Sequence, residues 1–370
     1  MPAALENLRI LDFSRVLAGP FATMMLADLG AEVIKIERPG TGDETRDFGP
    51  PYDELGHATY FEAVNRNKTS IALDLSSQAG AARARALAAE SDIVVENFRP
   101  GVLDRLGLGY DDLRPEHPAL IYCSITGFGR DAGADLTGYD LLVQALGGLM
   151  SITGPADGEP QKVGVALVDV LAGLFATVGI LAAVRHRDRS GEGQRVEVDL
   201  LTSLLASLAN QGSGYTIAGV IPGRMGNSHP SITPYELYRT LDGELVLTIG
   251  NDRQFGSLCR VIGAPELAGD ERYATNERRV HNRQALRADL ERTLARRSAQ
   301  EWTDELTRAR VPAGVVNDLA GAFALATRLG LDPIVTAPRE DGTPVQLTRN
   351  PIGLSVTPPT YRSAPPLLPG

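Results

Sequence analysis

Asp169 is the residue of this chain whose surroundings most clearly suggest chemistry. It carries the one charge in the segment 163–184, VGVALVDVLAGLFATVGILAAV, among apolar residues, glycines and a threonine. An unpaired carboxylate in such a setting costs several kcal/mol, or its pKa rises until the group is neutral. Three roles are open to it: a helix cap, an interruption of a membrane span, or a reactive group.

Capping and reactivity are compatible at this position. The apolar segment predicts a helix over 170–187, and Asp is a preferred N-cap residue. Backbone N–H groups at the start of that helix would keep the Asp169 carboxylate ionised, while the apolar surroundings would exclude water. An ionised and poorly hydrated carboxylate is a competent nucleophile for acyl transfer. Capping alone is nevertheless sufficient to explain the residue.

Several polar side chains follow predicted strands. Arg38 follows a strand over 31–37, and the motif ENFRPG (96–101) ends a strand over 92–98. Doubly wound sheets bind ligands at the carboxyl ends of their strands, so these side chains are expected to meet there. Arginine suits phosphate and an aromatic ring suits adenine, which indicates a nucleotide-bearing ligand, although each arginine alone would be an ordinary surface residue. The candidates are Arg38, Asn97, Phe98, Arg99 and Arg105.

The motif GYDLLVQ places Tyr139 and Asp140 at the start of a predicted helix over 139–150. An aspartate fits the first turn because of the helix dipole, and a tyrosine fits a core position. Neither residue indicates a function by itself.

Short apolar strands alternate with helices through the first 200 residues, which predicts a mostly parallel sheet covered on both faces. The first strand–helix turn, RVLAGP, has a single glycine. A Gly-x-Gly-x-x-Gly turn is therefore missing, and NAD binding is disfavoured although Glu37 stands where a ribose-binding acid would. Predicted strands are 8–14, 31–37, 69–75, 92–98, 119–128 and 194–200; predicted helices are 19–30, 77–90, 139–150 and 169–187.

The pattern changes after about residue 220. Residues 235–250 are typical of a hairpin around an Asp-Gly turn, and a second hairpin pattern surrounds 340–344. We predict a large α/β domain over 1–220, a smaller α+β domain over 225–320, and a segment over 321–370 that returns to the large domain. In the small domain the expected helices are 252–262, 277–297 and 299–309, and the expected return strand is 310–318.

Composition excludes several classes of function. The net charge is −10, from 36 basic and 46 acidic side chains, so a general nucleic-acid surface is not expected. Two cysteines are too few for a disulfide framework or a zinc site, and the five histidines have no metal-ligand spacing.

The N-terminal sequence MPAALENLRILDFS has no secretory signal pattern. The segment 163–184 is long enough to span a bilayer, but it contains Asp169 and lies between α/β segments, which favours a core helix. We therefore expect a cytoplasmic protein without a membrane span.

In combination, the motifs make the chain similar to family III CoA-transferases, the CaiB/BaiF group that includes formyl-CoA transferases. The similarity extends over essentially the whole chain. Each motif is a weak signal by itself, but together the motifs are highly specific for this family. Its pieces are LDFSRVLAGPFATMMLADLGAEVIKIERPGTGD (11–43), NRNKTSIALDL (65–75), VENFRPGVLDRLGLGY (95–110), SITGFG (124–129), GYDLLVQALGGLMSITG (138–154) and VGVALVDVLAGLFATVGILAAVRHRDRSGEGQ (163–194).

The resemblance implies a role for Asp169 as the nucleophile. It would attack a donor acyl-CoA to give a mixed anhydride, which the CoA thiolate converts to an aspartyl-CoA thioester. An incoming carboxylic acid would then repeat these steps in reverse order and leave as its own CoA ester. CoA is then a substrate, and no metal or prosthetic group takes part. The resemblance also implies a Rossmann-like large domain and an interlocked homodimer. Implied CoA contacts are Leu17, Ala18, Arg38, Leu73, Asn97, Phe98, Arg99, Arg105 and Tyr139.

This chain departs from the formyl-CoA transferase pattern in ways that bear on its substrate. Leu17 replaces a glutamine, and Ser76 and Thr137 replace lysines. The shielding run of four glycines is also absent; GNSHPS (226–231) stands there, so formyl and oxalate substrates are not favoured. Residues 226–255 and 273–286 are most similar to the succinyl-CoA-dependent branch that acts on glutarate or hydroxymethylglutarate. Gly226, Asn227 and His229 are then candidates for contact with the acyl group, unless they form an ordinary turn.

Two other functions compete with transfer. The α-methylacyl-CoA racemases resemble this chain, but they use a histidine where it has Tyr139, so one of their proton carriers is missing. A protein that binds acyl-CoA without turnover would have no need of Asp169 in its apolar setting. Transfer is therefore the favoured function.

Overall fold

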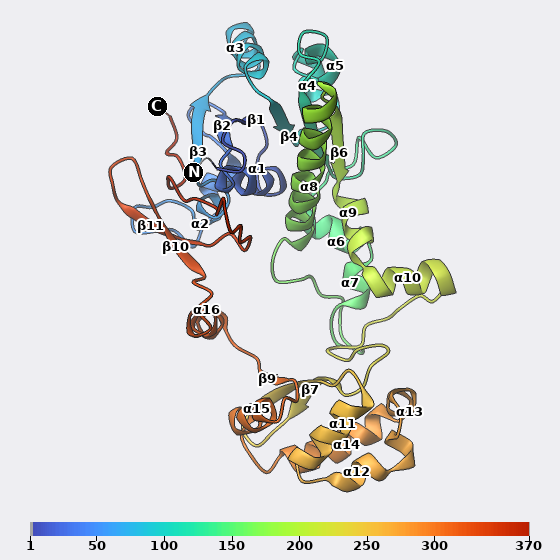
Figure 1. Cartoon of the computed structure of the whole chain (residues 1–370). Helices are drawn as coiled ribbons and strands as arrows, with labels where there is room; N and C mark the ends of the chain where they lie inside the picture. The colour runs from blue at the N-terminus through green and yellow to red at the C-terminus, as the bar shows by residue number, and fades with distance from the viewer. Residues whose placement is uncertain (1–2, 370) are drawn as a thin grey trace. The chain divides into compact units, whose positions relative to one another are not determined.

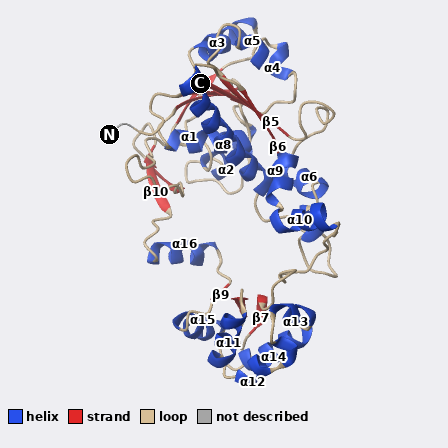
Figure 2. Ribbon diagram, turned by 45° about the vertical axis from the view of Figure 1, so that its right-hand side comes forward, coloured by secondary structure: helices blue, strands red, loops and turns tan. Residues whose placement is uncertain are grey.

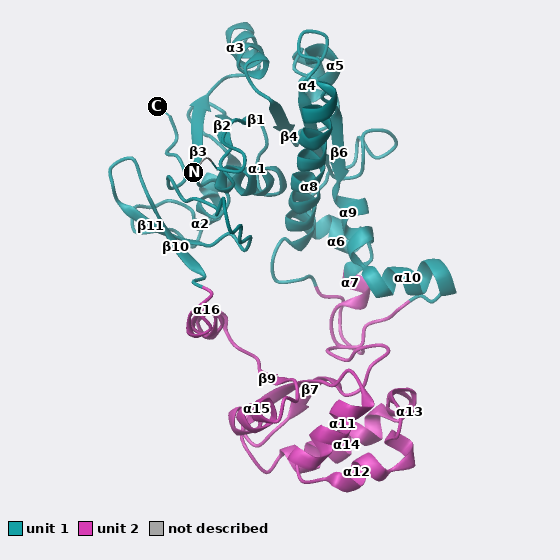
Figure 3. Ribbon diagram, in the orientation of Figure 1, with its two compact units in different colours: residues 1–149, 162–221, 332–370 teal, residues 150–161, 222–331 magenta. Residues whose placement is uncertain are grey.

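A computed structural model describes residues 3–369, and it divides the chain into two compact units. Unit 1 takes in the described residues up to 149 together with 162–221 and 332 onward, and unit 2 takes in 150–161 and 222–331 (Figure 3). Unit 2 is thus inserted into unit 1. The segment 150–161, which the sequence analysis assigned to the large domain, belongs to unit 2.

Unit 1 is built on a six-stranded sheet of order β3-β2-β1-β4-β5-β6 in which every neighbouring pair is parallel. This confirms the predicted α/β class. The order is that of a dinucleotide-binding fold, and the chain reverses direction across the sheet between β1 and β4. The strands are β1 (Arg9–Asp12), β2 (Glu32–Glu37), β3 (Lys68–Ala72), β4 (Ile93–Glu96), β5 (Ile121–Thr126) and β6 (Arg195–Asp199).

Helices cover both faces of this sheet (Figures 1 and 2). One face packs against α1 and α8 through a core that includes Ile10, Ile93 and Ile121, and the other packs against α3, α4 and α5 through Leu11, Val94 and Tyr122. Alternate residues of a strand point to opposite faces, so strands buried on both faces are mostly apolar; the buried charges of Asp12 and Lys35 are exceptions. The helices are α1 (Ala18–Asp28), α3 (Gln78–Ala89), α4 (Val102–Arg105), α5 (Tyr110–Leu113) and α8 (Leu167–Ser190).

The long helix α8 packs closely on α1. A side chain at Gly173 would come within 2.7 Å of the carbonyl oxygen of Ala18, so only glycine allows this approach. The helix is long and apolar enough to cross a membrane by length and composition. Its buried positions, which include Ala172, Ala176 and Ile180, recur every four residues and face α1 and the sheet, whereas Phe175 and Val178 are exposed.

The end of the chain is tied to the beginning through Asp28, which is fully buried at the end of α1. Its carboxylate accepts hydrogen bonds from Arg66, Asn67 and Asn350, and its carbonyl accepts one from the backbone N–H of Thr360. The remaining elements of unit 1 are η1 (Glu44–Asp47), α2 (Thr59–Glu62), α6 (Asp140–Leu146), α9 (Leu200–Ser207), α10 (Ala209–Ala218) and the hairpin β10 (Ile334–Pro338) and β11 (Pro344–Thr348).

Unit 2 combines a three-stranded antiparallel sheet, of order β7-β8-β9, with a layer of helices. The predicted hairpin over 235–250 is confirmed. The predicted helix over 277–297 is wrong as one element, because it breaks at Asn282 into two helices. The elements are β7 (Tyr235–Arg239), β8 (Glu244–Thr248), α11 (Asp252–Val261), α12 (Pro265–Gly269), η2 (Glu271–Tyr273), α13 (Asn276–His281), α14 (Arg283–Leu294), α15 (Ala299–Arg308), β9 (Ala313–Val315) and α16 (Leu319–Arg328); α7 (Leu149–Ile152) lies at the first boundary between the units.

Candidate active site

A cavity of about 290 Å³ in unit 1 opens where β1, β4 and β5 end. This is the edge of the sheet at which the strand order reverses and at which such folds bind ligands. The loops after the three strands line the cavity, together with the start of α8. Seven of the residues predicted from the sequence lie on its wall: Leu17, Ala18, Asn97, Phe98, Arg99, Tyr139 and Asp169.

A second cavity of about 210 Å³ lies beside the first and takes in two more predicted residues, Arg38 and Leu73. Phe98 lines both cavities, and so does Arg15, which the sequence analysis did not select. The predicted residue Arg105 lines neither of them; its guanidinium lies against Gly101 at the start of α4.

Asp169 is the third residue of α8 and not its N-cap. The helix begins at Leu167, and the cap residue Ala166 has no side-chain acceptor. The acceptor comes from another segment: Oδ1 of Asp140 accepts hydrogen bonds from the backbone N–H of Val168 at 2.8 Å and of Asp169 at 3.4 Å. The predicted capping role of Asp169 is therefore wrong, because Asp140 occupies that site.

Asp140 is itself held in place by Gln144, one turn along α6. The amide nitrogen of Gln144 donates to Oδ2 of Asp140 at 2.6 Å, and its amide oxygen accepts from the backbone N–H of Val163 at 2.9 Å. Gln144 is fully buried. Hydrogen bonds through Gln144 and Asp140 thus connect the segment that precedes α8 with the first turn of α6, and this network ends at the backbone of Asp169.

The electrostatic state of Asp169 differs from the one predicted. Burial, followed by the negative charge of Asp140, raises the pKa of Asp169 to about 7. The expectation that backbone N–H groups keep this carboxylate fully ionised is wrong, since those groups serve Asp140. At neutral pH the side chain is therefore poised between its protonated and its ionised form.

Tyr60, in α2, lies within electrostatic range of this carboxylate. Burial, and then the charge of Asp169, raise the pKa of Tyr60 to about 12. Its hydroxyl therefore stays protonated and can donate a hydrogen bond at neutral pH. The ring packs edge-on against Phe48, with the centroids 5.6 Å apart.

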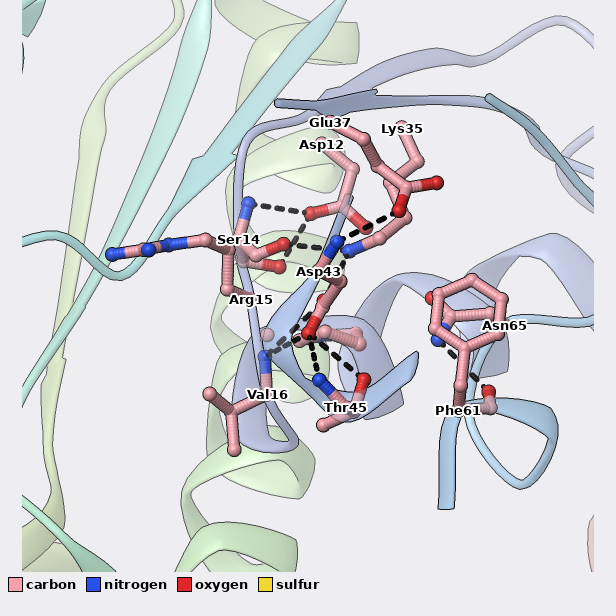
Figure 4. Close-up of polar contacts among 12 residues, drawn as sticks. Asp12, Ser14, Arg15, Val16, Lys35, Glu37, Asp43, Thr45, Phe61 and Asn65 are labelled. Atoms are coloured by element: carbon pink, nitrogen blue, oxygen red, sulfur yellow. Dashed lines mark hydrogen bonds and ion pairs between the residues drawn. The ribbon is translucent and has the colours of Figure 1, made fainter. Parts of the chain in front are cut away.

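The loop after β1 owes its shape to buried charges (Figure 4). Lys35 donates to the carbonyl of Ser14 and to Asp43, each at 2.8 Å, and Asp43 accepts from the backbone N–H of Val16. Val16 has a φ of 66°, which is rare for a β-branched residue and is kept only where the surroundings enforce it. These contacts fix the loop immediately before the cavity-lining Leu17.

A further ion pair lies beneath the same loop. Lys68 contacts Asp12 at 3.1 Å with both side chains fully buried, and Asp12 also accepts hydrogen bonds from Ser14 and Thr23. Burial lowers the pKa of Lys68 to about 8. Burial alone would raise the pKa of Asp12, but the positive charges of Lys68 and Lys35 outweigh it and lower that pKa. The cluster is satisfied only as a set.

The predicted substrate loop lies in unit 2. The backbone N–H of His229 donates to the carbonyl of Tyr235, and its ring nitrogen Nδ1 accepts from the backbone N–H of Ser231 at 3.0 Å. Arg283 donates to the carbonyl of His229 at 3.0 Å. Gly226 has a positive φ of 60°, and Asn227 is exposed. The prediction that Gly226, Asn227 and His229 contact the acyl group stays a prediction.

Metal chemistry has no ligand cluster to support it in the described part of the chain. Within residues 3–369, no group of three or more histidine, cysteine, aspartate or glutamate side chains is arranged to hold a metal ion. Glu37, the candidate ribose-binding acid, is used internally, because its carboxylate accepts from Arg46 and Ser70.

Known proteins resemble this chain over nearly its whole length. The model of CoA-transferase family III matches residues 5–370. The succinate–glutarate CoA-transferase of Agrobacterium fabrum is 44% identical over 370 residues, which cover 98% of this chain and 92% of the relative. The acetyl-CoA:oxalate CoA-transferase of Acetobacter aceti is 42% identical, with 86% of this chain and 82% of the relative covered. A crystal structure of a CaiB/BaiF family protein from Brucella suis has a TM-score of 0.88 and 42% identity, covering 100% of this chain and 97% of that chain.

Proposed function

The chain belongs to CoA-transferase family III and moves CoA between an acyl-CoA and a carboxylic acid, and we propose that it does so through a thioester on Asp169. One observation carries this proposal. The Asp169 carboxyl lines the same cavity as six residues expected to contact CoA, and its pKa of about 7 makes both protonation states available at neutral pH.

The proposed reaction has four steps. A carboxylate oxygen of Asp169 attacks the thioester carbonyl of the donor and displaces CoA as a thiolate, which leaves a mixed anhydride of Asp169 and the acyl group. The thiolate attacks the aspartyl carbonyl, which forms an aspartyl-CoA thioester and releases the donor acid. The acceptor carboxylate then attacks this thioester and frees the thiolate again. Attack of the thiolate on the acceptor's carbonyl gives the new acyl-CoA and restores Asp169.

The surroundings of Asp169 suit this course. Partial burial removes water that would hydrolyse an anhydride or a thioester. The hydroxyl of Tyr60 remains a proton donor near the carboxylate and can stabilise oxygen atoms that gain negative charge. No step needs a metal ion or a prosthetic group.

For CoA itself, we assign the adenosine end to the cavity that contains Arg38 and Leu73, and the thiol-bearing arm to the cavity that contains Asp169. Phe98 lies between them as an aromatic surface. Arg99 and Tyr139 line the cavity with Asp169. The side chain of Arg105 is exposed and can contact a phosphate group of CoA from the solvent side.

We propose succinyl-CoA or a similar thioester as donor and a dicarboxylic acid as acceptor. Both curated relatives described above are named for dicarboxylates, glutarate in one case and oxalate in the other. Identity of 42% to the oxalate-named relative keeps oxalate among the acids to be tested, despite the departures at Leu17, Ser76 and Thr137.

We also propose an interlocked homodimer. The chain leaves unit 1 near residue 221 and returns at 332, and Asp28 ties the returning segment to the first helix, so the backbone forms a closed loop through unit 2. A closed loop is the connectivity that interlocking requires. Exposed apolar residues on α8 and α10 provide surface for a partner: Phe175, Val178, Tyr215 and Ile217. Buried free cysteines suit a reducing compartment, and we place the enzyme in the cytoplasm.

The decisive experiment is to incubate the enzyme with succinyl-CoA, trap with hydroxylamine, and locate the modification by peptide mass spectrometry. A hydroxamate on Asp169 is expected in the native enzyme and not in Asp169→Asn. Absence of this adduct, together with entry of solvent deuterium at the α-carbon of a 2-methylacyl-CoA, would refute the proposed route through Asp169 and support racemisation.

A further inference from the structure

Arg15 occupies the boundary between the two cavities. It lines the cavity that contains Asp169 and also the cavity that contains Arg38 and Leu73. The other cationic side chains on these walls each belong to a single cavity, Arg99 to the first and Arg38 to the second. A ligand that extends from one cavity into the other must therefore pass Arg15.

The backbone of Arg15 is fixed from both sides. Its N–H donates to Oδ1 of Asn97 at 2.8 Å, and its carbonyl accepts from Nδ2 of the same side chain at 2.7 Å. Its neighbours Ser14 and Val16 are bound by the buried charges beneath the loop. Figure 4 shows the Arg15 side chain extending away from that cluster. The cluster thus fixes the backbone from which the Arg15 side chain extends.

The guanidinium itself is only partly satisfied. It lies 4.8 Å from the ring centroid of Phe98 and forms an ion pair with Glu44, whose Oε1 is 2.5 Å from Nη1. Its Nε is buried, and the described residues provide it with no hydrogen-bond partner. The side chain as a whole is 33% exposed and Glu44 is 46% exposed, so the ion pair faces solvent and is weak enough to be exchanged.

We propose that Arg15 binds the diphosphate of CoA, with Glu44 as the group that this diphosphate displaces. The order of parts in the ligand carries the assignment. In CoA the diphosphate stands between the adenosine and the thiol-bearing arm, and Arg15 stands between the cavities assigned to those two parts. A guanidinium on an aromatic ring, with a donor to spare, suits bidentate contact with phosphate oxygens. The inference rests on the proposed function for the identity of the ligand.

The test measures the binding of CoA to the full chain by calorimetry. Arg15→Gln should weaken CoA binding by about 10- to 100-fold, because a charge-assisted contact is lost. Arg9→Gln is a matched control: Arg9 has a side-chain exposure of 35% and is also paired with a glutamate, but it lines neither cavity. It should bind CoA as the native protein does.

A series of shortened ligands separates phosphate binding from a structural effect. Dephospho-CoA keeps the diphosphate, so Arg15→Gln should weaken it by the same factor as CoA. Pantetheine lacks the diphosphate and should bind the variant and the native protein equally at millimolar concentrations. Equal losses for all three ligands would mean that Arg15 only shapes the loop, and no loss for CoA would also overturn the proposal.

Glu44→Gln provides a second test that leaves Arg15 in place. Removal of the competing carboxylate should tighten CoA binding several-fold and leave pantetheine unchanged; unaltered or weaker CoA binding would contradict the exchange. Failure of the proposed reaction is a separate result. It would be seen as a missing hydroxamate on Asp169, whereas the ligand series reports on Arg15 without turnover.

Discussion

Replacement of Asp140 by asparagine tests the electrostatic account of Asp169 directly. The change keeps a side-chain oxygen that can accept from the backbone N–H of Val168, but it removes the negative charge. Burial is the larger cause of the raised pKa of Asp169 and the charge of Asp140 the second. The pKa should therefore fall in Asp140→Asn and still remain above the usual range of an aspartate.

The size of the effect follows from the pKa of about 7. For that value the carboxylate fraction is about 9% at pH 6, about 50% at pH 7 and about 90% at pH 8. A like charge in contact with the same helix terminus contributes on the order of one pKa unit. A fall of about one unit would raise the ionised fraction at pH 6 to about 50%, roughly a fivefold gain, with almost no gain at pH 8.

The assay is the pH profile of kcat/KM for succinyl-CoA, at saturating acceptor acid, with the product acyl-CoA separated by chromatography. This parameter reports ionisations of the free enzyme. The shape of the profile is compared and not its plateau, because loss of the hydrogen bond from Gln144 to the second oxygen of Asp140 can lower the plateau. Asp318→Asn is the matched control, since Asp318 also caps a helix, α16, but in unit 2.

The expected profile has an acidic limb that lies about one unit lower in Asp140→Asn than in the native enzyme and the control. A limb that stays in place would show that Asp140 does not perturb the ionisation that controls the rate. A limb that moves to higher pH would refute the sign of the effect.

Three other changes have effects of definite sign. Asp169→Asn should abolish transfer, and it should raise the unfolding free energy by up to about 4 kcal/mol at pH 8 but hardly at all near pH 4, which is followed as Tm at the two pH values. The raised folded-state pKa destabilises the folded native protein progressively from about pH 4, where the unfolded carboxyl ionises, to about pH 7, where the folded one does, and the full cost persists above pH 7. Lys68→Met should destabilise by about 3–5 kcal/mol in urea unfolding, because it leaves Asp12 buried without its ion-pair partner. Asp12→Asn in the same chain should recover part of the loss, because it removes the unpaired charge and keeps an acceptor for Ser14 or Thr23; an unaltered midpoint in the single variant would be inconsistent with the buried pair. Gly173→Ala should destabilise by about 1–3 kcal/mol, as its Cβ would meet the carbonyl of Ala18; full stability would mean that α1 and α8 can separate at no cost.

Much of unit 1 could be predicted because its signals are local. Strands such as β2 and β5 are short apolar runs bounded by turn residues, and the parallel arrangement follows from their alternation with helices. Helix α16 was not predicted, although Asp318 caps it and Gly330 follows its end; none of its residues is buried in the structure. The break between α13 and α14 at Asn282 could not be predicted, because the polar residues continue across it and nothing in the sequence marks the end of one helix and the start of another.

The site was predictable where it depends on strand ends and not where it depends on pairing between distant segments. Asn97, Phe98 and Arg99 could be placed at the ligand-binding edge because the carboxyl ends of parallel strands meet there, whereas Leu17 followed from the family resemblance. The contact between Asp140 and the start of α8 spans 28 residues and could not be inferred from either segment. The state of Asp169 was consequently misjudged. Tyr60 has no motif around it, so only the structure brings it near this carboxylate.

The attachment of the chain's end to Asp28 has a consequence for synthesis on the ribosome. Asp28 and Asn350 are 322 residues apart, so at ~5–20 residues per second the first waits roughly 15 to 65 s for the second. During that time the Asp28 carboxylate lacks one of its donors, and the N–H of Asn67, just before β3, lacks the carbonyl of Ser363 that accepts from it. Until residue 350 is made, the fully buried Asp28 carboxylate at the end of α1 therefore stays short of a donor, so α1 reaches its full stability only late in synthesis.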